Sequence, residues 1–239
     1  MVCRECHQNV LLQFAFRGRE DFCFVHTDRV AFPRDCTNPT GAAGVPQISE
    51  QEFARLPLRV HAFLARVPLH DVWAIDLPRS RGGITLDEFL RAASGCLFTP
   101  SPVVRAMLKI RFFVGGLFGW DRTTSTATTS ETFADRLTPA DRARSLAPAG
   151  LKDGPFRVVY RFENEYLMEL INRTAHAAAL STLVETASSY RFYLAVYVRS
   201  VSRFTPLYMA MIDPFRKFVV YPSLLRSVRA RWKQTVGAG

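Results

Sequence analysis

The amino-terminal part of the chain carries a cluster of cysteines that could bind a metal or a haem. Four of the five cysteines, Cys3, Cys6, Cys23 and Cys36, lie within the first 36 residues. Cys3 and Cys6 with His7 match the C-x-x-C-H pattern of haem attachment, and four thiolates could also hold a structural zinc. Haem attachment requires export, but the chain begins without the basic and then apolar segment of a signal peptide, and a zinc ribbon usually shows two C-x-x-C pairs. We therefore expect reduced thiols and no cofactor, with the four cysteines kept as zinc candidates.

His176 is the candidate for acid–base chemistry in the second half of the chain. Asn172, Thr174 and His176 alternate along a predicted strand, so they share one face and could present a polar patch to a ligand. Glu169 or Asp213 could pair with the imidazole in proton transfer. A histidine with polar neighbours on a mostly apolar strand is also typical of a buried, hydrogen-bonded core residue. We expect the structural role, with ligand contact and catalysis as alternatives.

Large, adaptable side chains recur in the predicted strands and in the last helix, and they could line a pocket for an apolar ligand. The candidates are Trp73, Tyr160, Met168, Asn172, His176, Tyr197, Tyr208, Met211 and Arg216. The same residue types fill hydrophobic cores, and periodicity does not separate the two roles. Asp213 and Arg216, three residues apart on a predicted helix, could line the pocket, but we expect a helical ion pair.

The residues before position 120 must supply one strand and two helices. Alternation over 69–77 predicts a strand that carries Leu69, Asp71, Trp73, Ile75 and Leu77 on one face. Thr85 and Glu88 stand at the spacing of a capping box, which predicts a helix over about 86–95. Ser101 and Pro102 begin a second helix with a basic face, which could lie on an anionic membrane surface but is expected to pack on the core.

The second half of the chain changes from helical to strand periodicity. Strands are predicted over 155–163, 165–173, 177–185 and 190–199, joined by short polar turns into an antiparallel meander. In the first of them Phe156, Val158, Tyr160 and Phe162 should share a face. Residues 203–235 predict a long helix that Pro214 and Pro222 kink or break. Its apolar side should carry Phe204, Leu207, Tyr208, Met211, Phe215, Phe218, Leu225 and Trp232.

Composition bounds the class of protein. A chain of 239 residues with 48% hydrophobic residues can bury a large core, and we expect one domain over 56–236 behind a poorly ordered extension and linker over 1–55. The formal net charge is +10, but only four basic residues are lysines and the arginines are scattered, so nucleic-acid binding is not expected. The sequence has no run of 18 uncharged apolar residues, which predicts no transmembrane segment and a cytoplasmic protein.

Several motifs in this order resemble a bacterial family of unknown function placed with the START-like (SRPBCC) superfamily. They are Asp71-Val72-Trp73-Ala74, Gly119-Trp120-Asp121, the stretch from Ile171 to His176, and the stretches from Tyr208 to Arg216 and from Val220 to Pro222. The resemblance covers roughly residues 57–235. In the last motif Arg216-Lys217 stands where the family is expected to have Arg-His, which removes one titrating group.

The resemblance implies a helix-grip fold of the α+β class. In that fold a curved antiparallel sheet wraps a long carboxy-terminal helix, two or three helices follow the first strand, and a cavity lies between sheet and helix. Related domains bind lipids, sterols or polyketides, and family members also occur fused behind short-chain-dehydrogenase-type NAD(P)-binding domains. No catalytic residue is implied.

Three functions follow as hypotheses. The first is binding of an apolar small molecule, such as a lipid or polyketide, in the cavity between the sheet and the 203–235 helix. The second is a cyclase-like or accessory enzyme in which His176 and a carboxylate move protons. The third is arginine-mediated binding to an anionic surface, which salt would weaken strongly.

Overall fold

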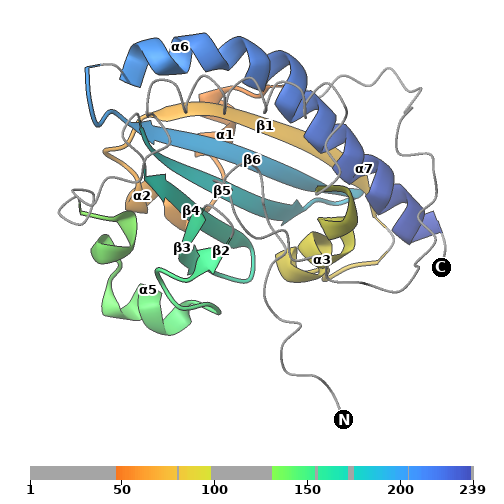
Figure 1. The fold of residues 1–239 in the computed structure, drawn as a ribbon. Helices are drawn as coiled ribbons and strands as arrows, with labels where there is room; N and C mark the ends of the chain where they lie inside the picture. The colour runs from red at the N-terminus through yellow and green to blue at the C-terminus, as the bar shows by residue number, and fades with distance from the viewer. Residues whose placement is uncertain are drawn as a thin grey trace, which may run out of the picture.

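The protein is built around one open antiparallel sheet of six strands in the order β1-β6-β5-β4-β3-β2 (Figure 1). The structure, a computed structural model, describes residues 47–79, 81–97, 131–153, 156–171, 175–203 and 205–237. The strands are β1 (Leu69–Pro78), β2 (Lys152–Asp153), β3 (Phe156–Arg161), β4 (Glu165–Ile171), β5 (His176–Glu185) and β6 (Ser189–Arg199). The predicted α+β class and the meander of the last four strands are therefore confirmed.

Helices flank the sheet at three points of the chain. Before β1 stand α1 (Glu50–Ala54) and α2 (Arg59–Phe63), and between β1 and β2 stand α3 (Leu86–Leu97), the 3-10 helix η2 (Phe133–Arg136) and α5 (Pro139–Arg144). The chain closes with α6 (Thr205–Phe215), the π-helical turn η3 (Arg216–Val220) and α7 (Tyr221–Gly237). Within the described ranges, none of the helices has the length and hydrophobicity that crossing a bilayer would need. The predicted helix after Ser101 and the four amino-terminal cysteines lie outside the described residues.

The capping box predicted at the start of α3 is present. The Glu88 backbone N–H donates to the Thr85 hydroxyl at 3.2 Å, and the Thr85 N–H donates to Glu88 Oε2 at 3.4 Å. These bonds satisfy N–H groups that a helix start leaves without intrahelical partners. Local sequence alone therefore accounts for where this helix begins.

Two register shifts change which side chains share a face. In β1 the pairing with β6 shifts between Leu69 and Asp71, and in β3 the pairing with β4 shifts between Val158 and Tyr160. A bulge inserts one residue and turns the following side chains to the opposite side of the sheet. The predictions that Leu69 shares a face with Asp71, and Val158 with Tyr160, are therefore wrong.

One face of the sheet is covered by α3 and α7. The core of this helix face contains Trp73, Ile75 and Leu77 from β1, with Phe89 from α3 and Trp232 from α7 among its partners. The Phe89 ring lies 5.4 Å from that of Trp232, and the Trp232 indole N–H donates to the Pro78 carbonyl at 2.9 Å. This hydrogen bond and the ring contacts hold α7 against the sheet.

The long closing helix is present, but its buried side differs from the prediction. Leu207, Met211, Phe215 and Phe218 are exposed, whereas Met209 joins Tyr208 in the interior. Pro214 cannot donate a backbone hydrogen bond, and the helix passes into the π turn two residues later, so one 3.6-residue period does not run through it. In α7 the buried side consists of Tyr221, Leu225, Val228 and Trp232.

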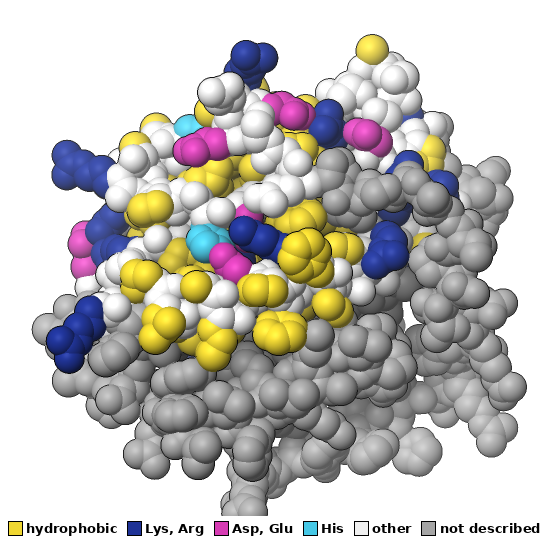
Figure 2. All heavy atoms as spheres, turned by 90° about the horizontal axis from the view of Figure 1, so that it is seen from above, with side chains coloured by type: hydrophobic (Ala, Val, Ile, Leu, Met, Phe, Trp, Pro, Cys, Tyr) yellow, Lys and Arg dark blue, Asp and Glu magenta, His cyan; other side chains and the backbone are white. Residues whose placement is uncertain are grey.

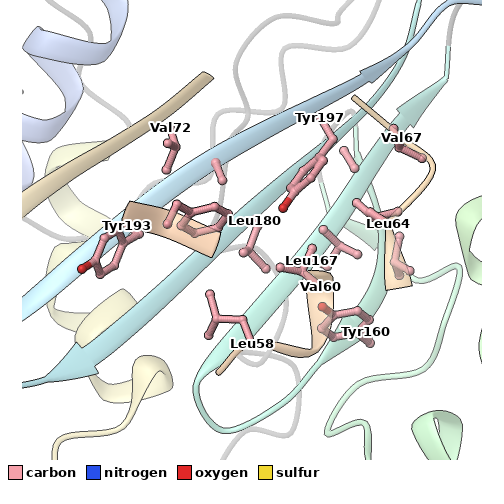
Figure 3. Close-up of a cluster of buried hydrophobic side chains, with 14 of the residues drawn as sticks. Leu58, Val60, Leu64, Val67, Val72, Tyr160, Leu167, Leu180, Tyr193 and Tyr197 are labelled. Atoms are coloured by element: carbon pink, nitrogen blue, oxygen red, sulfur yellow. The ribbon is translucent and has the colours of Figure 1, made fainter. Parts of the chain in front are cut away.

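The opposite face of the sheet has its own core, formed with α1, α2 and η2. Figure 3 shows Leu58, Val60 and Leu64 of the α2 region meeting Tyr160, Leu167 and other strand residues. Both carboxylate oxygens of buried Glu165 cap α2, accepting the Arg59 N–H at 2.7 Å and the Val60 N–H at 3.1 Å. Helices therefore close this side of the sheet.

Residues 47–54, which the prediction assigned to the extension, pack against the domain. Ile48 donates its N–H to the Val72 carbonyl at 3.0 Å along the edge strand β1, and Ser49 caps α1 through the Glu52 N–H. Phe53 is only 1% exposed. Residues from 47 onward belong to the domain because they cover a sheet edge and bury an aromatic ring.

Candidate ligand-binding site

A polar cluster lies where the start of β1 meets the end of α6 and the π turn. It consists of His70, Asp71, Asp213, Arg216 and Tyr221. Strand β1 supplies the first two residues and the closing helix supplies the other three. The π turn lies beside these buried charged residues. Because π turns inside helices are frequent at functional sites, we take this cluster as the candidate site.

The Arg216 side chain connects the helix residues of the cluster to β1 through its hydrogen bonds. Its Nη1 donates to Asp213 Oδ1 at 2.8 Å, its Nη2 donates to Asp71 Oδ2 at 3.2 Å, and its Nε donates to the Tyr221 hydroxyl at 3.0 Å. The guanidinium carbon also lies 5.1 Å from the Tyr221 ring centre. The predicted ion pair between Asp213 and Arg216 is thus confirmed, as part of a larger network that ties the helix to the sheet.

His70 forms a second pair within the cluster. Its Nε2 lies 2.8 and 2.9 Å from the two oxygens of Asp213, and Lys217 Nζ lies 3.8 Å from the same carboxylate. The His70 side chain is 23% exposed. An aspartate that holds one imidazole nitrogen orients the ring and directs its other nitrogen elsewhere, which is a geometry suited to proton transfer or to binding a polar ligand.

Two buried polar atoms beside this network have no hydrogen-bond partner. They are Asp71 Oδ1 and the indole nitrogen of Trp73, on alternate residues of one face of β1. The Asp71 side chain is 0% exposed, and burial raises the pKa of its carboxyl while Arg216 partly offsets the rise. Unpaired buried donors and acceptors are rare because each costs free energy, so an acceptor and a donor next to each other mark a place for a bound polar group.

The same residues do not fit a divalent cation well. Ligand atoms of His70, Asp71 and Asp213 lie within 4.8 Å of one another. Arg216 and Lys217 already balance the two carboxylates, and Arg216 occupies an oxygen of each. A metal would have to displace the guanidinium, so the charges favour an uncharged ligand.

A comparison with models of known protein families finds a family that matches the chain. The model of a family described as "Protein of unknown function (DUF2867)" matches residues 63–223. The chain belongs to the DUF2867 family. No curated protein and no solved structure gives a significant match.

The DUF2867 match spans the whole polar cluster, from His70 on β1 to Tyr221 at the start of α7. It also spans all six strands and the π turn. The match therefore includes every element that builds the site.

His176 is itself fully buried and belongs to a different network on the opposite face of the sheet. Its Nε2 donates to Glu169 Oε2 at 2.8 Å, because Arg199 donates to Nδ1 at 2.7 Å and so fixes the tautomer. Glu169 also accepts the Phe133 N–H at 2.8 Å, and the Phe133 ring stacks on the imidazole with centres 3.9 Å apart. With both nitrogens engaged and 0% exposure, His176 holds η2 against the sheet.

The structure divides the predicted pocket residues between the two faces of the sheet. Trp73, Met168, Tyr208 and Arg216 lie on the side of the carboxy-terminal helix. Tyr160, Tyr197 and His176 lie on the side of α2 and η2. Met211 is exposed on the outer side of α6, and Asn172 lies outside the described residues.

Sequence reasoning missed the partners of Arg216 on β1. The motif Asp71-Val72-Trp73 was recognised, and so was the pair Asp213 and Arg216, but their contact joins positions 145 residues apart. His70 gave no signal, because a bulge follows Leu69 and sets its direction. An open hollow of about 440 Å³ lies beside the start of α3, lined by Thr85, Glu88, Arg91 and Leu146 among others.

Proposed function

We propose that this protein binds a small, largely apolar molecule between the sheet and the closing helix. The molecule carries one uncharged polar group, a hydroxyl or a carboxamide, which both donates and accepts a hydrogen bond. The single observation behind this proposal is the pair of unpartnered atoms on β1, Asp71 Oδ1 and Trp73 Nε1.

The chemistry of the two atoms defines the polar group. Ionised Asp71 can only accept, and the Trp73 indole can only donate. Residues two apart on a strand are about 7 Å apart, so one group of two or three heavy atoms can reach both side chains. A carboxylate would meet the negative charge of Asp71 and is disfavoured, whereas an alcohol or amide satisfies both atoms.

The surroundings of Trp73 suit an apolar body. Trp73 packs in the same buried cluster as Met168 and Leu194, and its ring centre lies 5.3 Å from that of Tyr221. Aromatic and methionine side chains can adapt to irregular apolar ligands. The resemblance to START-like domains, whose relatives bind lipids, sterols or polyketides, supports the same ligand class.

The test is native mass spectrometry of the full chain, followed by denaturing extraction of any bound compound. Wild-type protein should carry a reproducible adduct, or should gain thermal stability from a panel of sterols, long-chain alcohols and fatty amides. Asp71→Asn and Trp73→Phe should each lose the adduct or the stabilisation while remaining folded.

Two controls match these variants on the same structure. Asp76→Asn changes an exposed carboxylate of β1, and Trp232→Phe changes an indole whose N–H is already bonded to Pro78. Both should keep the ligand. An adduct that survives Asp71→Asn and Trp73→Phe, or no response to any compound of the panel, would overturn the proposal.

A further inference from the structure

The outer side of α6 is apolar along its whole length. Its exposed residues are Pro206, Leu207, Ala210, Met211, Pro214 and Phe215, and Phe218 continues the row on the π turn. Leu207 is 70% exposed, Phe215 50% and Phe218 78%. A helix on the surface of a globular protein normally turns charged and polar residues to solvent, so this face requires a partner.

The inner side of the same helix is already occupied. Tyr208 and Met209 pack with Ala175 and Val198 of the sheet, and Asp213 is held by His70 and Arg216. Whatever covers the outer side must therefore bind the folded domain from outside. In Figure 2, which looks down on this face, hydrophobic side chains lie around a small patch of histidine, acidic and basic side chains.

The charged residues along the closing helix indicate which kind of partner fits this face. Between residues 201 and 239 the chain has seven basic residues and one acidic residue, Asp213, which faces inward. The basic residues are Arg203, Arg216, Lys217, Arg226, Arg229, Arg231 and Lys233. Arg226 and Lys233 are exposed on α7, and Arg226 Nε donates to the Pro222 carbonyl at 2.9 Å. The closing helix therefore presents apolar side chains next to cations, without an exposed carboxylate of its own.

We infer that α6 docks the folded domain onto the surface of an anionic lipid bilayer. Leu207, Met211, Phe215 and Phe218 would enter the boundary between headgroups and acyl chains, and Arg226 and Lys233 would contact lipid phosphates. A second copy of this chain fits less well, because pairing the same faces would bring cations together. Docking is independent of the proposed ligand, since it uses the opposite side of α6.

Vesicle co-sedimentation of the full chain tests this inference. Wild-type protein should sediment with vesicles of phosphatidylcholine containing 30% phosphatidylserine or phosphatidylglycerol, and much less with pure phosphatidylcholine. Binding should weaken as salt is raised from 50 to 500 mM. Phe215→Ser with Phe218→Ser should lower the vesicle affinity at least about tenfold, because two large apolar side chains no longer insert.

Charge and position are tested by two further variants. Arg226→Gln with Lys233→Gln should lower the affinity for anionic vesicles by about fivefold for each residue and leave residual binding to neutral vesicles unchanged. Leu146→Ser, which removes an exposed leucine from the loop after α5, should bind as wild type does. All of these positions are exposed, and circular dichroism checks that the variants fold.

Three outcomes would overturn the inference. They are no sedimentation of wild type at 50 mM salt, unchanged binding of the Phe215 and Phe218 variant, and a dimer in light scattering that the same variant dissociates without any vesicle binding. Loss of the Asp71-dependent adduct has no bearing on these results, so failure of the ligand proposal and failure of docking are distinguishable.

Discussion

The carboxylate of Asp71 is buried with one oxygen unbonded, and its local energetics can be measured. Burial raises its pKa above the unfolded value, so the folded state binds the proton more tightly and loses stability as the pH rises through that pKa. Asp71→Asn keeps an oxygen for Arg216 and removes the buried charge. Its free energy of unfolding should therefore equal or exceed that of wild type at pH 7, and the difference should vanish below about pH 4.

A loss of stability is expected instead when Arg216, the ion-pair partner of Asp71, is replaced. Arg216→Met leaves two carboxylates beside each other without their guanidinium and should lower the free energy of unfolding by about 3–5 kcal/mol. Urea denaturation of both variants at pH 7 and pH 4 measures the contrast. A loss of more than about 1 kcal/mol in Asp71→Asn at pH 7 would show that the carboxylate stabilises the fold, which removes the reason to assign it to a ligand.

The Glu169 and His176 pair makes a separate prediction at the scale of single residues. Glu169 Oε2 accepts one hydrogen bond from His176 and one from the Phe133 N–H. Glu169→Gln should lower the free energy of unfolding by about 1.5–3 kcal/mol, the usual worth of a hydrogen bond to a charged group. Glu163→Gln, at an exposed position of the neighbouring hairpin, should change it by less than about 0.5 kcal/mol. Equal stabilities in thermal or urea unfolding would contradict the structural role given to His176.

At the scale of elements, α5 is tied to α2 by an ion pair that responds to acid. Arg59 donates to both oxygens of Asp141, at 3.0 and 2.8 Å, and Thr138 donates to the same carboxylate. The hydrogen bond from Arg59 is the main reason that the pKa of Asp141 falls to about 2. A lowered carboxyl pKa stabilises the fold above the unfolded value near 4, and this stabilisation is lost between about pH 4 and pH 2.

Asp141→Asn should therefore lower the free energy of unfolding by about 2 kcal/mol at pH 7, and the gap to wild type should narrow from pH 4 to pH 3. Denaturant titrations at these three pH values make the measurement. Asp76→Asn is the matched control, since Asp76 is an exposed aspartate of β1 that lies 3.6 Å from Arg191 and not beside Arg59. If the difference in free energy of unfolding between wild type and Asp141→Asn stayed constant from pH 7 to pH 3, the ion pair would be excluded as its cause.

Elements with a local cause were predictable from sequence. The capping box of Thr85 and Glu88 predicted the start of α3, and period-two alternation indicated β4. The face of the sheet on which each β3 side chain lies was not predictable from sequence, because the bulge between Val158 and Tyr160 leaves no mark in the alternation. The outer row of α6 was assigned to the core for a similar reason, since the π turn interrupts the helical period.

The candidate site was predictable only in parts. Asp213 and Arg216 are neighbours on the closing helix, and their spacing of three residues predicts an ion pair. Their contacts with His70 and Asp71 depend on tertiary packing of α6 across the start of β1, and no local pattern encodes packing at that separation. Sequence reasoning placed Trp73, Tyr160 and His176 in one pocket because periodicity does not tell which side of a sheet each strand turns inward.

At the scale of the whole molecule, the two hydrophobic cores lie back to back on one sheet. Strands β4, β5 and β6 contribute alternate residues to both cores, so losing either core exposes strands that the other needs. Edge strand β1 pairs with β6 across more than one hundred residues of chain. These shared strands predict one cooperative unfolding transition that includes the closing helix.

Two cavity variants, one in each core, test this cooperativity. Leu167→Ala opens the core beside α2, and Leu225→Ala opens the core beside α7, where both leucines are 0% exposed. Each should lower the free energy of unfolding by about 2–5 kcal/mol. Native-state hydrogen exchange should show the most protected amides of β5 and β6 losing protection in both variants, by an amount equal to each variant's own loss of unfolding free energy. If Leu225→Ala instead accelerated exchange only in α7 and left the strands unchanged, the helix would open as a separate unit, and access to the site between helix and sheet would not require unfolding of the domain.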